Sequence, residues 1–525
     1  MTAMPHPLPD LGPAAPTPPI ELAGGAAAAT ARLDVEPVEV PGDVLDRLRS
    51  ACASVDVDPG VRAEASRDWW PLAMSWATTG QVAALAGAVA RPGDVHEVSA
   101  VLAICNEAGI PVTAAAGRSG VCGASVPLYG GVVLDMTGLD GIVDVDETSL
   151  VLDVAPGTFG DHLEARLRAE HGATLGHWPQ SVALSTVGGW LACRSAGQLS
   201  TRYGKIEDMV LGLDVALADG RVIRTGGAPR SAVGPDLTQL FVGSEGTLGV
   251  ICGARLRLHP TPQAELPGAW LVDGFEAGLD AMRRIVQRGA TPAVLRLYDE
   301  VESQRTYHTP DGKALLLVLD EGDPTLVEAT MAMVAQELDG AEPAPSEHIE
   351  HWMERRNDVA ALEALISKGY TVDTMEVSAS WAALPGIYRS TVDALLAVEG
   401  TIAASAHQSH SYTSGGCVYF TFAGQVDADR RDDYYRQLWD AGQRAVLAHG
   451  GALSHHHGVG LNRGRFMAEA LGGAFDVLLA AKQALDPNGI LNPGKLGLPS
   501  PWGPAPARLT FEEIGPGGRD LFPRA

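Results

Sequence analysis

Three consecutive histidines at positions 455–457 are the residues of this chain best suited to proton transfer. They precede the turn-forming segment Gly458-Val459-Gly460. An imidazole titrates near neutral pH and can therefore act as a general acid or base. Successive side chains of an extended segment alternate, which would place His455 and His457 on one face without His456. A metal site, a hydrogen-bonded structural cluster and a solvated turn are alternatives, but no further well-spaced ligands accompany the histidines, so we predict no metal ligands.

An alternating run around Tyr419 predicts a strand with a phenol on its polar side. In this run Val418, Phe420 and Phe422 alternate with Tyr419 and Thr421. Successive side chains of a strand point to opposite faces, so the three apolar residues are expected to face a core and Tyr419 the other side. There the hydroxyl of Tyr419 can be a hydrogen-bonded structural group or an acid/base that meets a substrate.

Three arginines occupy positions where a guanidinium needs a partner. Arg296 interrupts the apolar run 293–298. A buried arginine must either support a neighbouring group or hold an anion. Arg355 and Arg356 follow Trp352 on an expected helix. They can form surface ion pairs or bind a phosphate group.

Three segments combine glycines with hydroxyl side chains in a way that suits a flat, phosphorylated ligand. They cover residues 114–121, 179–197 and 243–251. Small residues let the backbone approach a ligand closely, and successive N–H groups can form a concavity that holds an anion. Each segment alone could be an ordinary tight turn. Their occurrence in one region and in this order favours a site for a diphosphate and a tricyclic ring.

The helices and strands that must position these residues are expected in two consecutive parts of the chain. The first begins with a β-α-β unit whose helix opens at Asp94, with Glu97 placed to return the capping-box bond, and ends at Gly109. Its strands are expected at residues 85–90, 110–115, 131–135, 150–154, 213–218 and 249–258, with a second helix at 159–170. After residues 259–262 the pattern restarts. The later strands are expected at 270–272, 294–297, 315–319, 402–406 and 417–422, with helices at 276–288 and 432–449 and one opened by Asp323-Pro324.

A chain of 525 residues is too long for one hydrophobic core, so we expect two or more domains. The fold class is α+β. We place a mobile or irregular N-terminal segment at residues 1–60, an α+β domain at 61–262, and an α/β domain with an antiparallel sheet at 263–450. A C-terminal segment follows at 451–497 and a tail at 498–525.

Charge and cysteine content limit the partners and the compartment. The formal net charge of −26 repels nucleic acid and anionic membrane surfaces. The six cysteines form no C-x-x-C pair, a pattern typical of reduced thiols in the cytosol. No stretch reaches the roughly 18 uncharged apolar residues of a spanning helix. These observations predict a cytoplasmic protein that binds no nucleic acid.

The three glycine-rich segments resemble the FAD-binding domain of the vanillyl-alcohol-oxidase (PCMH-type) flavoprotein superfamily. The resemblance runs from about residue 80 to residue 262 and resumes at residues 485–495. It implies a PCMH-type FAD-binding domain and an α/β cap, or substrate, domain, with residues 451–497 returning to the flavin. Some members attach FAD to a histidine of the first loop, and because residues 114–121 contain none, we expect non-covalent FAD. The implied FAD contacts are Ala114, Ala115, Ala116, Gly117, Arg118, Ser119, Gly120, Gln180, Ser181, Ser185, Thr186, Gly188, Gly189, Cys193, Arg194, Ser195, Gly197, Glu245, Gly246, Thr247, Gly249, Val250, Ile251 and Asn492.

Five further stretches resemble the alkylglycerone-phosphate synthase (alkyl-dihydroxyacetonephosphate synthase) family, the ether-lipid branch of the superfamily. They cover residues 184–190, 203–208, 407–412, 417–420 and 453–460. The resemblance implies that Tyr419 is the catalytic acid/base and that residues 455–457 are an essential triplet. It also implies that Arg356 binds the substrate phosphate, with Arg355 beside it, and that activity needs Arg296. The implied reaction exchanges the acyl group of acyl-dihydroxyacetone phosphate for a fatty alcohol, and uses FAD without net redox change.

The leading alternative is an FAD-linked oxidoreductase of D-2-hydroxy acids, of the D-lactate or glycolate type. Such relatives carry a G-H-x-G-D-G-N-x-H run, which the region 407–422 lacks, and a Glu before a single His, where this chain has His456 before His457. A non-catalytic FAD-binding protein is a further alternative, and the retention of Tyr419 and the triplet disfavours it. The resemblance is also compatible with peripheral contact with a membrane and with a homodimer.

Overall fold

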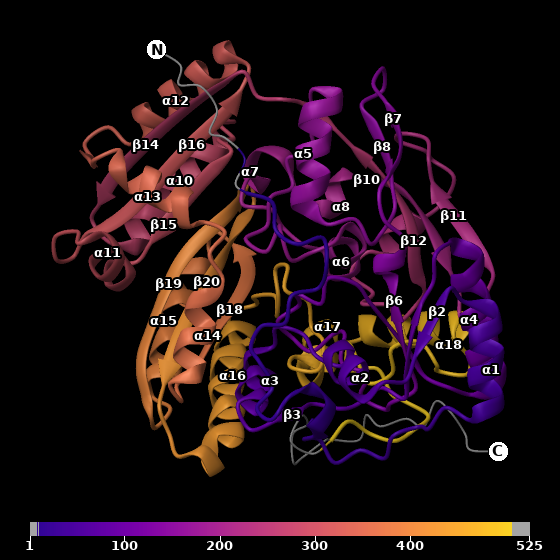
Figure 1. Cartoon of the computed structure of the whole chain (residues 1–525). Coiled ribbons are helices and arrows are strands. Elements are labelled where there is room, and N and C mark those ends of the chain that lie inside the picture. The colour runs from indigo at the N-terminus through magenta and orange to yellow at the C-terminus, as the bar shows by residue number, and fades with distance from the viewer. Residues whose placement is uncertain (1–7, 9, 507–525) are drawn as a thin grey trace.

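Two regions of the molecule lie side by side in the computed structural model, which describes residues 8 and 10–506 (Figure 1). The first region holds two small sheets, and the second is built on one large antiparallel sheet. The fold class expected from the sequence, α+β with an antiparallel sheet in the second region, is confirmed.

A parallel β-α-β unit forms the centre of the four-stranded sheet, which has the order β2-β4-β6-β5. Its strands are β2 (Ser54–Asp56), β4 (Ala88–Arg91), β6 (Val132–Asp135) and β5 (Val112–Ala115). Helix α4 (Val95–Ala108) connects β4 to β5, with Asp94 as its N-cap and Gly109 in the left-handed conformation at its end. The capping box expected from Glu97 is wrong: its carboxylate accepts the N–H groups of Ala53 and Gly93 instead.

The five-stranded sheet of the first region is antiparallel and has the order β11-β10-β12-β8-β7. Its strands are β11 (Val222–Gly226), β10 (Val210–Ala216), β12 (Val250–Arg257), β8 (Val151–Val154) and β7 (Ile142–Asp146). Leu163 and Leu167 of helix α5 (Gly160–His171) pack with Leu152 and Leu213 of this sheet. This buried cluster fixes the sheet beside the glycine-rich segments that follow α5 and β10.

The second region is a seven-stranded sheet with the order β17-β14-β16-β15-β19-β20-β18. Its strands are β14 (Ala264–Val272), β15 (Val294–Tyr298), β16 (Ala314–Gly322), β17 (Glu342–Pro343), β18 (Thr371–Ser380), β19 (Thr401–Tyr412) and β20 (Gly415–Gly424). All of its paired strands are antiparallel. The alternation seen in the sequence of β20 is confirmed, since Val418, Phe420 and Phe422 are buried in the core.

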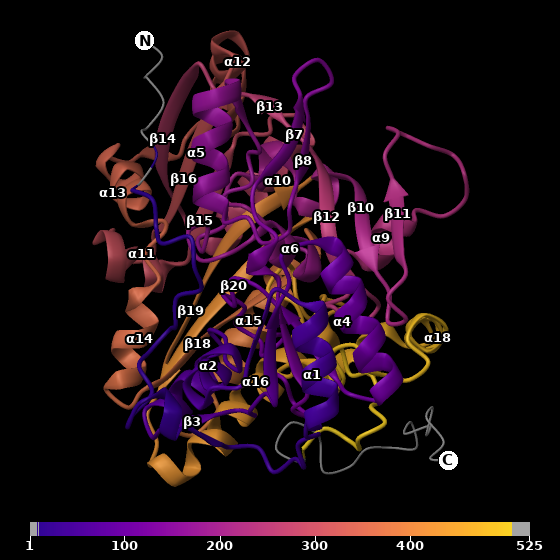
Figure 2. The ribbon, with the colours of Figure 1, turned by 45° about the vertical axis from the view of Figure 1, so that its right-hand side comes forward.

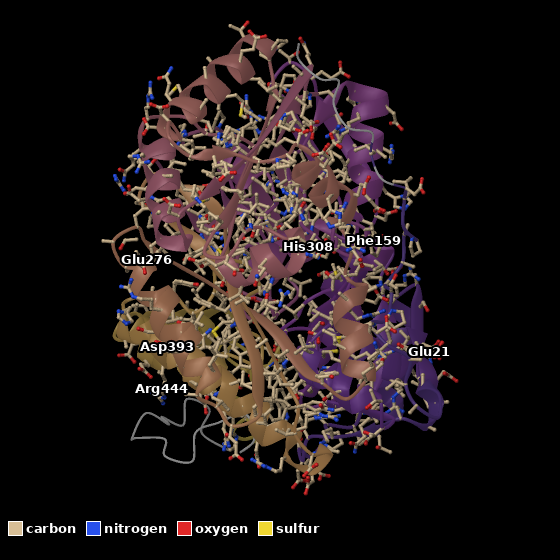
Figure 3. The ribbon with its side chains drawn as sticks, turned by 90° about the vertical axis from the view of Figure 1, so that its left-hand side faces the viewer. Glu21, Phe159, Glu276, His308, Asp393 and Arg444 are labelled. Carbon is tan, nitrogen blue, oxygen red and sulfur yellow. The ribbon has the colours of Figure 1, made fainter. Side chains whose placement is uncertain are left out.

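One face of the large sheet lies partly against Ile349 and Trp352 and partly toward the first region, and four helices cover its opposite face (Figures 1 and 3). They are α10 (Phe275–Gln287), α12 (Pro324–Glu337), α15 (Leu384–Leu396) and α16 (Arg431–Ala448). Their buried side chains form one cluster with Val418, Phe420 and Leu297 of the sheet. Figure 3 labels Glu276, Asp393 and Arg444 on the outer side of this helical layer. Residues of the sheet that alternate with the core residues therefore point to the face opposite this helical layer.

The chain returns to the first region after α16. Helices α17 (Met467–Leu471) and α18 (Ala474–Leu485) lead to Leu491, which forms a bridge with Val112 of β5. Figures 1 and 2 both place α18 on the side of the molecule that holds α4. The N–H of Asn492 donates to the carbonyl of Val112 over 2.8 Å. The C-terminal segment therefore adds main-chain hydrogen bonds to strand β5 of the four-stranded sheet.

Part of the N-terminal segment that we expected to be mobile or irregular is regular structure. Helix α1 (Gly42–Ala51) packs on α4, and β2 joins the four-stranded sheet. The buried residues of α1 are Val44 and Leu48, a helical spacing that the expectation of an irregular segment overlooked. Of the expected tail, Trp502 lies near the ring of Tyr129, whereas residues 507–525 lie outside the described part of the chain.

Short helices and bridges connect these layers. They are β1 (Thr30–Ala31), β3 (Gln81–Val82), β9 (Ala173–Thr174), β13 (His259–Pro260), α2 (Pro59–Ala65), α3 (Pro71–Ala77), α6 (Val187–Cys193), α7 (Ser200–Tyr203), α8 (Ile206–Met209), α9 (Leu237–Phe241), α11 (Glu300–Tyr307), α13 (Glu347–Arg355) and α14 (Ala360–Ser367). Among the described residues, no helix combines the length and apolar character needed to cross a bilayer.

Candidate active site

A row of polar side chains crosses four strands of the large sheet on the face that lacks the helical layer. The register pairs Tyr298 of β15 with His407 of β19, His407 with Tyr419 of β20, and Tyr419 with Glu376 of β18. Residues directly opposite in a ladder share a face. Arg296 lies two residues before Tyr298 and therefore points to the same side. The sheet thus gathers into one line groups that are more than a hundred residues apart in sequence.

Glu376 draws the three histidines into a tight turn. The N–H groups of His455, His456 and His457 donate to the same Oε1 atom over 3.1, 3.0 and 2.8 Å. The hydroxyl of Ser454 donates to that oxygen over 2.5 Å. The segment is therefore not extended, and the expectation that His455 and His457 share a face without His456 is wrong.

Arg463 compensates the buried charge of Glu376. Its Nη1 lies 3.2 Å from Oε1, and its Nη2 bonds Oε2. The guanidinium carbon also lies 4.9 Å from the centre of the Trp439 ring. Burial by itself would raise the pKa of Glu376, but Arg463 and His457 together hold that pKa well below its ordinary value. Neither Glu376 nor Arg463 was predicted as a site residue.

Tyr419 contacts two of the three imidazoles. Its hydroxyl forms a short hydrogen bond with Nε2 of His456 and lies 3.4 Å from Nε2 of His457. Its ring stacks on His407, with 4.8 Å between centroids and 18° between planes. Burial raises the pKa of Tyr419 and lowers the pKa of His456, both far from their ordinary values. The pair is therefore a neutral phenol and a neutral imidazole at physiological pH, which can exchange a proton along the bond.

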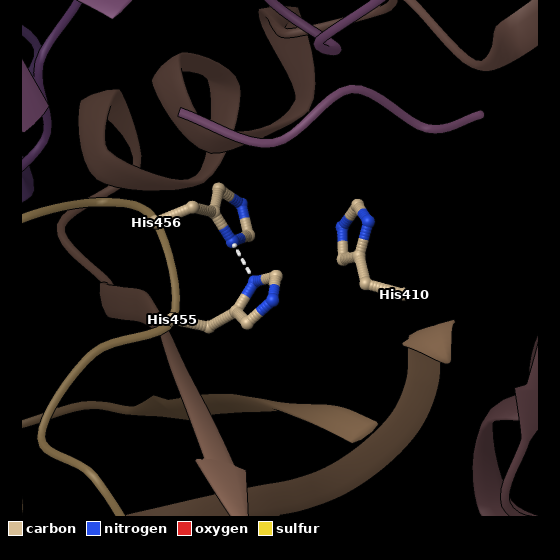
Figure 4. A group of neighbouring side chains, drawn as sticks. All are labelled: His410, His455 and His456. Carbon is tan, nitrogen blue, oxygen red and sulfur yellow. Dashed lines mark hydrogen bonds between the residues drawn. The ribbon is translucent and has the colours of Figure 1, made fainter. Parts of the chain in front are cut away.

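The imidazole of His410, which lies outside the triplet in sequence, approaches His455 and His456 (Figure 4). Nδ1 of His455 lies 2.8 Å from Nδ1 of His456, and the His410 ring stacks on His455 with 5.0 Å between centroids. One ring nitrogen from each of the three lies within 4.8 Å of the others, a spacing at which they could hold a metal ion. His410 has a φ of 61° at an irregularity of β19 between Ser409 and Ser411. That irregularity, which the sequence does not reveal, turns His410 toward the triplet.

Arg296 is held by the polar row rather than by a carboxylate. Its Nε donates to the hydroxyl of Tyr298 over 2.7 Å, and its Cζ lies 5.0 Å from the centre of that ring. The Tyr298 ring lies 5.6 Å from the ring of His407, which in turn stacks on Tyr419. Arg296 therefore sits at the end of the same row as Tyr419, in accord with a role at this site.

Arg356 lies where the second region meets the first. Its guanidinium carbon is 5.3 Å from the centre of the Trp178 ring and 5.8 Å from that of Trp352. Burial lowers the pKa of Arg356 to about 10, which leaves it charged at neutral pH. No contact joins it to Tyr419 within the described chain. Arg355, expected beside it as a second ligand, is exposed at the end of α13.

Two hydrogen bonds anchor the loop that carries Arg356 to the second glycine-rich segment and to the residue that follows it. The side-chain amide of Gln198 donates to the carbonyl of Arg356, and that of Gln180 donates to the carbonyl of Asp358, both over 2.7 Å. The loop is therefore fixed against the segment 179–197, where a flavin contact was expected.

The first glycine-rich loop follows β5 directly and fits a diphosphate. Within the described chain, no acceptor lies within hydrogen-bond distance of the N–H groups of Arg118, Ser119 and Gly120. Nη1 of Arg118 is buried without a hydrogen-bond partner, 3.8 Å from Asp135. Gly117 lies so close to the neighbouring chain that a Cβ there would stand 2.3 Å from the carbonyl oxygen of Leu184. Free backbone donors and a guanidinium nitrogen without a hydrogen-bond partner at the end of a strand suit the two phosphates of FAD.

The second and third segments contribute mainly backbone to this site. The hydroxyl of Ser185 is committed to neighbours, donating to Ser181 and accepting from Trp190. The side chains of Val250 and Ile251 lie in two hydrophobic clusters, so only their main chain can face a cofactor. The remaining expected contacts lie on or beside α6 and in the turn before β12: Thr186, Gly188, Gly189, Cys193, Arg194, Ser195, Gly197, Gly246, Thr247 and Gly249.

Glu245 and Asn492 join the expected cofactor segments to the histidine turn. The carboxylate of Glu245 accepts the N–H groups of Val459 over 2.6 Å and of Gly460 over 2.9 Å. The side-chain amide of Asn492 donates to the carbonyl of Glu245 over 2.6 Å and to that of Ala124 over 2.9 Å. These bonds place the cofactor loops and the imidazoles in one connected site.

Two family models cover most of the chain. The model described as "FAD binding domain" matches residues 86–226, and that described as "FAD linked oxidases, C-terminal domain" matches residues 261–496. The FAD-linked oxidoreductase YgcU of Escherichia coli O157:H7 is 33% identical over 78% of this chain and 88% of its own. An alkyldihydroxyacetonephosphate synthase of Dictyostelium discoideum is 28% identical over 79% of this chain and 74% of its own. The glycolate oxidase subunit GlcD of Bacillus subtilis is 29% identical over 81% and 92%.

Solved structures show the same fold. An alkyldihydroxyacetonephosphate synthase structure superposes with a TM-score of 0.74 at 24% identity and covers 90% of each chain. p-Cresol methylhydroxylase superposes with a TM-score of 0.70 at 19% identity, covering 89% of this chain and 99% of its own. The FAD-binding fold expected from the glycine-rich segments is therefore confirmed.

Proposed function

Because this chain belongs to the family of FAD-linked oxidases and its cofactor is FAD, we propose that it catalyses ether formation like an alkylglycerone-phosphate synthase. The acyl group of acyl-dihydroxyacetone phosphate would be exchanged for a fatty alcohol. The observation that carries the proposal is the neutral phenol of Tyr419, hydrogen-bonded to the imidazole of His456. An exchange of one oxygen substituent for another needs a group that gives and takes a proton, and this pair can do both.

Each step of the proposed reaction has a group to perform it. FAD, held by the glycine-rich loops, would supply a ring that can act as a nucleophile and as a leaving group. Tyr419 gives a proton to the departing carboxylate or takes one from the incoming alcohol. Arg356 holds the phosphate, because its charge is retained and its planar guanidinium can donate two parallel bonds to phosphate oxygens. Arg296 supports Tyr419 through the polar row.

We propose that FAD is bound without a covalent link. Covalent attachment needs a nucleophilic side chain in the cofactor loops, and residues 114–121 contain no histidine. Two thiols lie at or beside these loops: burial raises the pKa of Cys122 well above its ordinary value and that of Cys193 to about 12. Both thiols are therefore protonated and poor nucleophiles.

A second candidate is oxidation of a D-2-hydroxy acid. The similarity to the glycolate oxidase subunit extends over 92% of that chain, which favours this candidate. Tyr419 and His456 could also remove a proton from a hydroxyl group, and Arg356 could bind a carboxylate. Against it, the carboxylate nearest the histidines, Glu376, is already paired with Arg463.

An assay with two substrates separates the candidates. The protein, purified with its FAD, would be incubated with palmitoyl-dihydroxyacetone phosphate and hexadecanol, without an electron acceptor, and the ether product measured by mass spectrometry. Ether formation supports the synthase. Bleaching of the flavin by D-lactate or glycolate, with no ether product, would overturn it in favour of the oxidoreductase.

A further inference from the structure

Four side chains of the site are joined in one chain of hydrogen bonds. The hydroxyl of Tyr412 lies 2.7 Å from Nε2 of His455, and Nδ1 of His455 lies 2.8 Å from Nδ1 of His456. Nε2 of His456 then bonds the hydroxyl of Tyr419. Each imidazole therefore uses both of its nitrogens, one toward a tyrosine and one toward the other imidazole. Figure 4 shows the bond between the two imidazoles.

The bond between the two imidazoles couples their protonation. Burial lowers the pKa of His455 and the pKa of His456 well below the ordinary value, so each ring carries a single proton. A bond between two Nδ1 atoms needs one donor and one acceptor. If His455 carries its proton on Nδ1, then His456 carries its own on Nε2. If His456 carries its proton on Nδ1, then His455 carries its own on Nε2. The two rings are therefore always in opposite tautomers.

We propose that Tyr412, His455 and His456 form a proton relay that ends on Tyr419. Tyr412 gives its hydroxyl proton to Nε2 of His455, whose Nδ1 proton passes to Nδ1 of His456, whose Nε2 proton passes to the Tyr419 phenolate. Three bonds to hydrogen break and three form, and one negative charge moves from Tyr419 to Tyr412. The reverse sequence returns the charge. The catalytic use of the relay rests on the proposed acid/base role of Tyr419.

The surroundings hold the relay in place and leave one end of it near the surface. The ammonium of Lys205 donates to the carbonyl of His455 over 2.6 Å, and the carboxylate of Glu376 accepts the backbone N–H groups of His455 and His456. Tyr412 is the last residue of β19, next to the exposed turn of Thr413 and Ser414. Tyr419 lies inside the site. Tyr412 is therefore a positioning residue, which acts on the reacting atoms only through the two rings.

Removal of the Tyr412 hydroxyl tests the relay. In Tyr412→Phe, kcat for ether formation is expected to fall by about 10- to 100-fold with KM nearly unchanged, within the range of a lost proton-transfer aid. The dependence of kcat on the deuterium content of the solvent should change from curved, as when several protons move together, to linear. The matched control is Tyr434→Phe, which removes a hydroxyl bonded to Thr401 over 2.9 Å outside the relay. Site-specific 3-fluorotyrosine at position 412 should restore the curved dependence.

Unchanged kcat and an unchanged solvent dependence in Tyr412→Phe would overturn the relay. A second measurement needs neither Tyr412→Phe nor the substrate. Nitrogen-15 NMR of the holoenzyme labelled at histidine should show one ring protonated on Nδ1 and the other on Nε2, with signals assigned from His455→Gln and His456→Gln. Identical tautomers, or a doubly protonated ring at pH 7, would contradict the proposal.

Metal analysis of the same sample supplies a further outcome. One tightly bound zinc per chain on His410, His455 and His456 would occupy the Nδ1 atoms and would overturn the relay. Absence of ether synthesis in the wild type, with opposite tautomers present, would leave the relay standing and refute the proposed function. The two failures are therefore distinguishable.

Discussion

The cofactor loops and the polar row of the large sheet build their parts of the site in opposite ways. The loops are short contiguous runs that offer backbone N–H groups, as at Arg118, Ser119 and Gly120. The row is assembled from side chains on four strands, and its buried carboxylate Glu376 is neutralised by Arg463 from a fifth segment. A backbone site is local in sequence and tolerates little change in residue size. A side-chain site is dispersed and depends on compensated charge.

The largest loss of activity is expected from a substitution in the polar row, the half of the site whose residues are dispersed in sequence. Tyr419→Phe removes the hydroxyl that exchanges a proton with His456, so turnover should fall by about 10²- to 10⁴-fold. The FAD content, read from the visible absorbance of the purified protein, should not change, because the cofactor loops are untouched. Tyr388→Phe, which removes a hydroxyl on the helical side of the sheet, is the control. Wild-type turnover in Tyr419→Phe would remove this residue from the mechanism.

Glu376→Gln should show that the dispersed half also depends on charge compensation. The substitution leaves the guanidinium of Arg463 buried without its counter-charge, which is expected to lower the free energy of unfolding by about 3–5 kcal/mol. Denaturant unfolding of the holoenzyme measures the change. Glu302→Gln is the matched comparison, because Glu302 is a largely but not fully buried carboxylate that pairs with an imidazole, that of His407 at 3.3 Å. Its loss should reduce that free energy by only about 1–2 kcal/mol. Equal losses of unfolding free energy in the two variants would mean that the ion pair with Arg463 does not contribute to stability.

The pH dependence of the free energy of unfolding tests the same charge compensation of Glu376. The folded pKa of Glu376 lies well below its ordinary value, so its contribution is present above the unfolded pKa of about 4.3 and is lost as pH falls toward the folded pKa. The difference in unfolding free energy between wild type and Glu376→Gln should therefore be constant above about pH 5 and shrink in stronger acid. A difference that grows as the pH falls would contradict this assignment.

Substitution of Arg356, which lies where the two regions meet, tests whether this residue binds the substrate phosphate. Arg356→Leu should raise KM for a phosphorylated substrate by about 10- to 100-fold, because a charge-assisted bond is lost, with a smaller change in kcat. Arg355→Leu, at the exposed neighbouring position, should leave KM unchanged. If both variants bind the substrate like the wild type, the phosphate ligand lies elsewhere.

The smallest effect is expected from a substitution in the cofactor loops, the half of the site whose residues are contiguous in sequence. In Gly117→Ala, the new Cβ would stand 2.3 Å from the carbonyl oxygen of Leu184, so the loop must shift. Such overpacking is worth about 1–3 kcal/mol, which should appear as weaker FAD binding in a titration of the apoprotein. Gly42→Ala is the control, because nothing lies near that position. Equal FAD affinity in both variants would show that the tight approach at Gly117 is not needed.

The same contrast explains how much could be predicted from the sequence. The alternation of β20 placed Tyr419 on the correct face, and the glycine-rich runs led to the confirmed FAD-binding fold. The role of Glu376 could not be predicted, because its partners Arg463 and the histidine turn reach it only through the tertiary fold. The turn itself was expected to be extended, since a run of three histidines has no periodicity that reveals a shared acceptor. The irregularity that brings in His410 has no sequence signal either.

The bridge between Leu491 and Val112 has a consequence for the order of biosynthesis. Ile490 and Leu491 are fully buried in the core that contains Val112 and Leu134. That core cannot close until residue 491 has left the ribosome, after the whole second region has been made. Nascent chains should therefore capture FAD only after translation is nearly complete, and a truncation before residue 490 should yield a colourless protein.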